Sequence, residues 1–188
     1  MFKVIIGGLI GGLIAIIWSF ISWGVFSWHD LCINKFCNQE HVARVIQENT
    51  SVDGVYIAPS CFVNVSEMRQ GGTSCQKTTG PFVYVQVKKN LTLCSPSRYI
   101  YSFILYFIGA SLIGFLLLKV VDGCYRKRLF FVTMVALLVG ILELGPNWIW
   151  FGSGYRFALI MTIDILIQWF LIGLFLAKFV QPQLTKKT

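Results

Sequence analysis

Acidic residues and histidines are scarce in this sequence, which has 8 Asp and Glu together and 2 His among 188 residues. A structural zinc site needs four nitrogen or sulfur ligands at recognisable spacings. His29, Asp30, Cys32 and Cys37 lie close together, with His41 further along, but their spacing fits no such site. We therefore predict no metal site.

Recognisable catalytic motifs are also missing. The sequence contains no G-x-S-x-G nucleophile motif, no phosphate-binding G-x-x-x-x-G-K-S/T and no H-E-x-x-H. No catalytic residue and no cofactor are predicted, and we favour a protein that is not an enzyme.

Charged residues make up only 13% of the chain, whereas 56% of it is hydrophobic. Such a composition is far from that of soluble proteins. Residues 4–28 carry no charge, and this run exceeds the roughly 20 residues that cross a bilayer as a helix. Three further apolar runs follow at 99–121, 129–144 and 157–180. The sequence predicts an all-α membrane protein in contact with lipid, with a bundle of four transmembrane helices.

The first apolar run resembles a signal peptide because Lys3 precedes it, but it is too long and no small-x-small cleavage pattern follows. We predict that residues 1–28 remain as transmembrane helix 1, a signal anchor. Gly145-Pro146 is expected to end or kink helix 3. The other predicted segments are an extracytoplasmic domain (29–98), helix 2 (99–121), a cytoplasmic loop (122–128), helix 3 (129–144), an aromatic extracytoplasmic connection (145–156), helix 4 (157–180) and a cytoplasmic tail (181–188).

Most of the net charge of +8 lies in short flanks of the apolar runs. Short loops rich in Lys and Arg stay in the cytoplasm, so both termini are predicted to be cytoplasmic. Orientation and anionic lipid account for the basic residues. A nucleic-acid ligand is not expected, because no basic and aromatic patch lies elsewhere. The flanking residues are Lys3, Lys119, Arg126, Lys127, Arg128, Lys178, Lys186 and Lys187.

The domain at 29–98 is predicted to combine a helix and strands. Asn38 precedes QEHVARVIQEN, whose apolar residues share one face, so a short helix with Asn38 as its N-cap is expected. GVYIA at 54–58 is typical of a strand, which Pro59 ends. FVYVQV after Pro81 predicts a second strand or hairpin. Glycosylation sequons begin at Asn49, Asn64 and Asn90.

Five of the six cysteines belong to this domain. In an oxidising compartment they favour up to two disulfides with one thiol left over, and their pairing stays open. A thiol-disulfide oxidoreductase is an alternative, although Cys32-x4-Cys37 differs from the usual C-x-x-C spacing. The five cysteines are Cys32, Cys37, Cys61, Cys75 and Cys94.

Polar residues within the apolar runs form the candidate site. Asp164 and Gln168 lie one turn apart on a helix, and Glu143 and Arg156 flank the preceding connection at similar depth. An intramembrane polar network of these four residues, with Asn147 or Ser22 as possible members, is predicted. It serves either to hold the helices together or to carry protons, ions or a lipid headgroup.

Gly7, Gly8, Gly11 and Gly12 form a small-xxx-small stripe on helix 1. Because glycine lacks a Cβ, a partner helix can approach this stripe closely. The partner is either another helix of the same chain, or a second copy or another protein.

Four stretches of the sequence resemble a group of uncharacterised small bacterial inner-membrane proteins with four transmembrane helices and one extracytoplasmic loop domain. They are IIWSFISWGVFSWH, GVYIAP, GPFVYV and ELGPNWIWFG. The resemblance implies that architecture and a bacterial inner membrane, and no activity. We expect a non-enzymatic binding or assembly protein of the cell envelope. The alternatives are a transport or channel subunit that uses Asp164 and a membrane thiol-disulfide oxidoreductase.

Overall fold

The computed structural model describes residues 1–59, 80–89, 95–119 and 124–181. The chain divides into two compact units, a helical unit of Met1–Asn34 with Leu93–Thr188 and a smaller unit of Lys35–Thr92. Several residues of the predictions above lie outside the described ranges: Cys61, Cys75, Cys94, Asn64, Asn90, Lys186 and Lys187.

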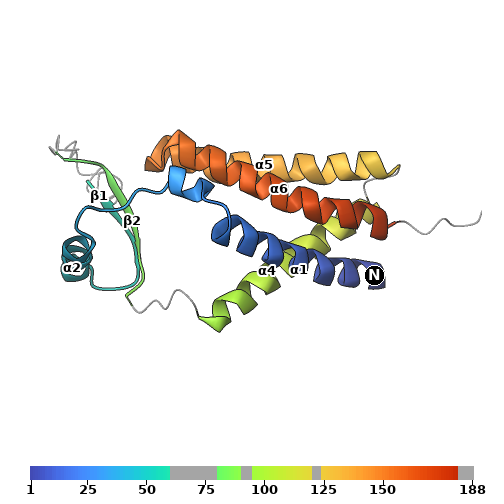
Figure 1. Cartoon of the computed structure of the whole chain (residues 1–188), viewed down its shortest axis with the longest axis horizontal. Helices are drawn as coiled ribbons and strands as arrows, with labels where there is room; N and C mark the ends of the chain where they lie inside the picture. Colours follow the sequence, from blue (N-terminus) through green and yellow to red (C-terminus); the bar gives the residue numbers. More distant parts are fainter. Residues whose placement is uncertain (60–79, 90–94, 120–123, 182–188) are drawn as a thin grey trace, which may run out of the picture. The chain divides into compact units, whose positions relative to one another are not determined.

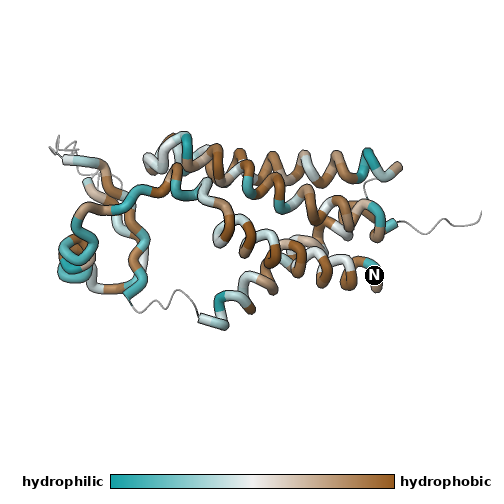
Figure 2. Tube along the Cα trace, viewed as in Figure 1, coloured by the Kyte–Doolittle hydropathy of each residue, from teal (hydrophilic) through white to brown (hydrophobic). Residues whose placement is uncertain are grey.

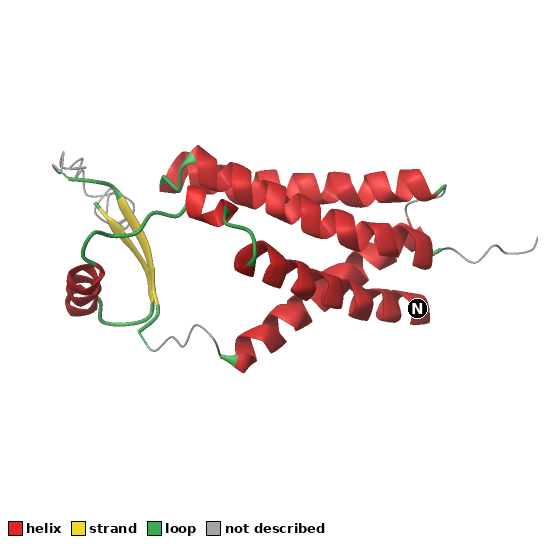
Figure 3. Ribbon diagram, viewed as in Figure 1, coloured by secondary structure: helices red, strands yellow, loops and turns green. Residues whose placement is uncertain are grey.

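The helical unit contains four long apolar helices, α1 (Phe2–Gly24), α4 (Pro96–Lys119), α5 (Tyr125–Phe151) and α6 (Tyr155–Phe179) (Figures 1 and 3). At 1.5 Å per residue even the shortest extends about 34 Å, more than the hydrocarbon core of a bilayer. Hydrophobic residues follow the helices along most of their length (Figure 2). All four meet the length and composition needed to span a membrane, which confirms the predicted number of spans.

Helix α5 is longer than predicted. It begins at Tyr125 and continues through Gly145 and Pro146 to Phe151, so the expectation that this helix ends at 144 is wrong. Proline removes one helical hydrogen bond and disfavours helical geometry in the preceding residue partly through that residue's Cβ. Because Gly145 has no Cβ, this second penalty is reduced. The predicted connection at 145–156 therefore shrinks to residues 152–154, where Gly152 and Gly154 adopt positive φ angles of 69° and 80°.

Helix α1 packs against α4 on one side and α6 on another, while α5 packs against α6. The glycine stripe makes these approaches possible. A Cβ on Gly11 would lie 2.7 Å from the Cβ of Ala110 in α4, and one on Gly7 would lie 2.9 Å from side chains of α6. Gly8 and Gly12 face α4 in the same way. All four glycines are buried inside this chain, so the stripe is not a surface for a second copy or partner.

Arg128 joins three helices at the end of the helical unit where α5 begins. Its side chain is only 2% exposed. Nε donates to the carbonyl of Ala177 at 3.2 Å, Nη1 to that of Leu117 at 3.0 Å, and Nη2 to that of Val180. These carbonyls end α4 and α6, where a helix has no internal donors and its dipole favours a cation. Arg128, which the sequence analysis grouped with the charges flanking the apolar runs, is therefore a buried cap of two helix ends.

The smaller unit contains α2 (Gln39–Asn49) and an antiparallel pair of strands, β1 (Gly54–Ala58) and β2 (Val83–Val87), with Tyr56 opposite Val85. Asn38 is the N-cap of α2, as predicted, and its Oδ1 accepts from the backbone N–H of His41 at 2.9 Å.

Asp53 connects the strand ends of this unit. Its carboxylate accepts from the backbone N–H of Lys89 at 2.9 Å and forms an ion pair with Lys88 at 2.9 Å. The Lys89 amide, followed by the Lys88 ammonium, lowers the pKa of Asp53 below its ordinary value.

Candidate functional site

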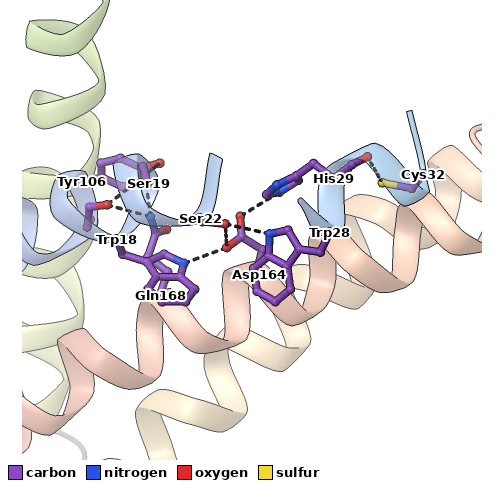
Figure 4. A network of polar contacts seen from close by, with 10 residues as sticks. Trp18, Ser19, Ser22, Trp28, His29, Cys32, Tyr106, Asp164 and Gln168 are labelled. Carbon is purple, nitrogen blue, oxygen red and sulfur yellow. Dashed lines mark hydrogen bonds and ion pairs between the residues drawn. The ribbon is translucent and has the colours of Figure 1, made fainter. Parts of the chain in front are cut away.

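Asp164 of α6 is the centre of a polar network inside the helical unit (Figure 4). One carboxylate oxygen, Oδ1, accepts two hydrogen bonds of 2.7 Å, from Nε1 of Trp18 and from Oγ of Ser22. Ser22 is fully buried and in turn accepts from Nε1 of Trp28 at 3.2 Å. Charged groups within a membrane need such partners. The network therefore attaches the C-terminal end of α1 to α6.

The short 3-10 helix η1 (Trp28–Leu31) brings His29 to the second carboxylate oxygen. Nε2 of His29 lies 3.6 Å from Oδ2 of Asp164, which is close enough for an ion pair but too long for a hydrogen bond. The His29 side chain is 6% exposed, and its imidazole stacks on Trp23 with ring centroids 3.8 Å apart. Within the described ranges neither ring nitrogen has a hydrogen-bond partner. His29 thus contributes stacking and electrostatic contact with Asp164.

A second set of polar contacts lies one turn further along α6. Nε2 of Gln168 donates to Oγ of Ser19 at 3.1 Å and to the carbonyl of Ala15 at 3.2 Å. Ser19 Oγ also lies 3.4 Å from the hydroxyl of Tyr106 in α4. Since Ser19 already donates to Ala15 at 2.9 Å, Tyr106 is the donor in this contact. The chain of contacts links α6, α1 and α4.

Tyr106 and Ser19 also line a groove of about 400 Å³ between α1 and α4. Figure 1 shows α4 crossing α1 and leaving it toward its own N-terminal end. Small residues allow α1 and α4 to approach closely where they cross. Beyond the crossing, the bulkier Phe20 and Trp23 of α1 line the groove. Phe20 stacks on Tyr99 of α4 with centroids 5.4 Å apart. The groove offers aromatic rings together with hydroxyl groups.

The structure brings together only part of the predicted network. Asp164, Gln168 and Ser22 belong to it, but Glu143 and Arg156 are exposed. Nε of Arg156 donates to the hydroxyl of Tyr155 at 3.3 Å. Arg156 precedes Asp164 by eight residues, about 12 Å along a helix axis, which is beyond its reach. Glu143 is exposed next to the buried Leu144 in α5.

Sequence reasoning missed Trp18, His29 and Tyr106. A signal existed for Trp18, because it precedes Ser22 by one helical turn and both therefore share one face. None existed for His29, whose position depends on how η1 folds back toward α6.

Cys32 and Cys37 are free cysteines, as is Cys124, so the disulfide prediction finds no support at the two described positions. The thiol of Cys32 donates to the carbonyl of His29 at 3.2 Å, and burial raises its pKa. A redox-active cysteine needs a lowered pKa, so Cys32 lacks that property. In the part of the chain that the structure describes, no three metal-ligating side chains are grouped.

No protein-family model, curated protein or solved structure matches this chain. The four apolar helices define it as a multi-pass membrane protein in contact with lipid. The resemblance to small bacterial inner-membrane proteins stays a prediction.

Proposed function

We propose that the protein is a non-enzymatic binding protein of the cell envelope, which holds an uncharged lipid-like component of the membrane in the groove between α1 and α4. The observation that carries this proposal is the groove of about 400 Å³ between two helices that can span a membrane. Such concave sites, mostly apolar with a few converging polar groups, are typical of ligand pockets.

The chemistry of the lining favours an uncharged ligand with a polar oxygen and a hydrocarbon tail. Phe20 and Trp23 offer apolar surface, while Ser102 and Tyr106 offer hydroxyl groups. The lining contains no Lys, Arg, Asp or Glu, so a phosphate or carboxylate would find no counter-charge there. Tyr106 donates to Ser19 and keeps an acceptor oxygen for a hydroxyl of the ligand.

The proposed location is a bacterial inner membrane with both termini in the cytoplasm. Lys3, Lys119 and Lys178 occupy the start of α1 and the ends of α4 and α6, and Lys and Arg near membrane spans favour the cytoplasmic side. The smaller unit, Lys35–Thr92, is then extracytoplasmic.

Chemical labelling of single-cysteine variants tests this orientation. We expect a membrane-impermeant thiosulfonate to label Cys37 in intact spheroplasts and Cys124 only after permeabilisation, since both thiols are exposed. Hydrogen bonding to the backbone of Lys127 lowers the pKa of Cys124, which favours its reaction once the reagent has access. Labelling of Cys124 in intact spheroplasts would invert the orientation.

Filling the groove tests the binding function. We expect Ser102→Trp to reduce binding of 1-monoolein, an uncharged lipid with hydroxyl groups, by at least about tenfold, the effect of losing roughly 1.4 kcal/mol. Tyr101→Trp is the matched control, because Tyr101 is the preceding residue of α4 and is 69% exposed. Binding to the purified protein in detergent is measured by native mass spectrometry. Equal binding by both variants would contradict the proposal.

A further inference from the structure

Two further grooves lie at the opposite end of the helical unit, on either side of Lys3. One has a volume of about 510 Å³ and is lined by Phe2, Phe115, Leu118, Lys119 and Gln181 besides Lys3. The other has about 570 Å³ and is lined by Leu174, Phe175, Lys178, Phe179 and Gln181 besides Lys3. The two grooves share Lys3 and Gln181, so they adjoin.

Three lysines from three different helices line these grooves: Lys3 from α1, Lys119 from α4 and Lys178 from α6. All three are exposed, and none has a carboxylate partner among the described residues. The described acids of the helical unit, Asp30, Glu143 and Asp164, belong to the other end of the helices. Among the described residues, the grooves therefore present positive charge without a carboxylate beside it.

Apolar side chains form the remaining walls. Phe115 and Leu118 lie in one groove, and Phe175 and Phe179 lie in the other, where their rings stack with centroids 5.1 Å apart. A cationic site next to apolar walls on spanning helices fits a ligand that is anionic at one end and a hydrocarbon at the other. Basic pockets between transmembrane helices bind the headgroups of anionic lipids in this way.

We propose that these adjoining grooves bind an anionic phospholipid, with its phosphate held by Lys3, Lys119 and Lys178 and its acyl chains lying along the phenylalanine walls. This site is independent of the α1–α4 groove and takes a ligand of opposite chemistry, because the latter has no charged lining.

Helix dipoles explain only two of the three lysines. Lys119 and Lys178 lie in the last turns of α4 and α6, where a cation is favourable. Lys3 lies in the first turn of α1, where the dipole disfavours a cation. A bound phosphate supplies the compensating negative charge for Lys3.

The test compares dioleoylphosphatidylglycerol with dioleoylphosphatidylcholine, which has the same acyl chains but no net charge. Native mass spectrometry of the full chain in detergent measures binding of each lipid. We expect the phosphatidylglycerol to bind more tightly than the phosphatidylcholine. Lys3→Gln should weaken binding of the phosphatidylglycerol about fivefold, the effect of one lysine near a lipid surface. The variant that also carries Lys119→Gln and Lys178→Gln should lose the preference between the two lipids.

Lys127→Gln is the matched control, since Lys127 is exposed at the start of α5 and lines neither groove. If the lipid binds in the two grooves, Lys127→Gln should leave its binding unchanged. If it binds only through the general positive charge of the surface, Lys127→Gln should weaken binding as much as Lys3→Gln. Equal effects would overturn the proposal, as would an unchanged lipid preference in the triple variant. Inorganic phosphate is added as a competitor at millimolar concentration; displacement of the lipid by it would show an anion site without lipid recognition and also overturn the proposal.

Discussion

Replacing Arg128 by methionine is expected to lower the free energy of unfolding by about 3 kcal/mol or more, because each buried acceptor left without a donor costs about 1–3 kcal/mol. The guanidinium donates to the carbonyls of Leu117, Ala177 and Val180, and the surrounding side chains are apolar. Methionine has a similar volume but no donor. Unfolding of the purified protein by SDS in mixed micelles measures the change.

Arg126→Met is the control for this substitution. Arg126 lies two residues earlier in α5 and is exposed, so its loss should change the free energy of unfolding little. Arg128→Lys should give an intermediate result, because an ammonium cannot present donors in the planar arrangement of a guanidinium. Equal stability of Arg128→Met and Arg126→Met would show that Arg128 does not cap the two helices.

Replacing Asp164 by alanine is expected to destabilise the protein by about 3 kcal/mol, since it leaves the half-buried Trp18 and the buried Ser22 without an acceptor. Asp164→Asn should cost only about 1 kcal/mol, because both donors contact Oδ1 and an amide keeps that oxygen. SDS-induced unfolding measures the free-energy change, and tryptophan fluorescence reports the environment of Trp18.

The same pair of variants separates a structural carboxylate from one that carries protons. A proton carrier must release and rebind its proton, so Asp164→Asn would abolish pH-dependent flux in proteoliposomes while leaving the fold intact. If Asp164 only holds the helices together, the unmodified protein should show no pH-dependent flux in proteoliposomes. Destabilisation of the Asn variant as large as that of the Ala variant would show that the charge of Asp164, beyond its acceptor oxygen, is required.

Local patterns were sufficient to predict the spans and the small elements. Apolar runs identified the helices, the side chain of Asn38 identified the start of α2, and Pro59 marked the end of β1. Each of these features depends on neighbours within a few residues, where the physical rules are strong. Asp164 and Gln168 were also found locally, because polar residues in an apolar helix need partners.

The partners themselves depend on packing between distant segments. The sequence alone treated Arg128 as one of several flanking charges, because nothing near it indicates that two helix ends converge on it. It also grouped Glu143 and Arg156 with Asp164 by depth, although both are exposed and Arg156 lies about 12 Å along the helix axis from Asp164. The continuation of α5 past Pro146 is a local effect. Because Gly145 has no Cβ, it avoids part of the steric clash that proline causes with the residue before it.

The contact between α1 and Asp164 has a consequence for biosynthesis. Ser22 precedes its acceptor by 142 residues, and ribosomes add about 5–20 residues per second. Helix α1 therefore waits roughly 7–30 s in the membrane before Asp164 is synthesised, at the elongation rate just given. A carboxylate in this early helix would face lipid unpaired throughout that interval. The chain instead places neutral serine and tryptophan donors in α1 and the charge in α6, so the acid enters the membrane when its partners are already there.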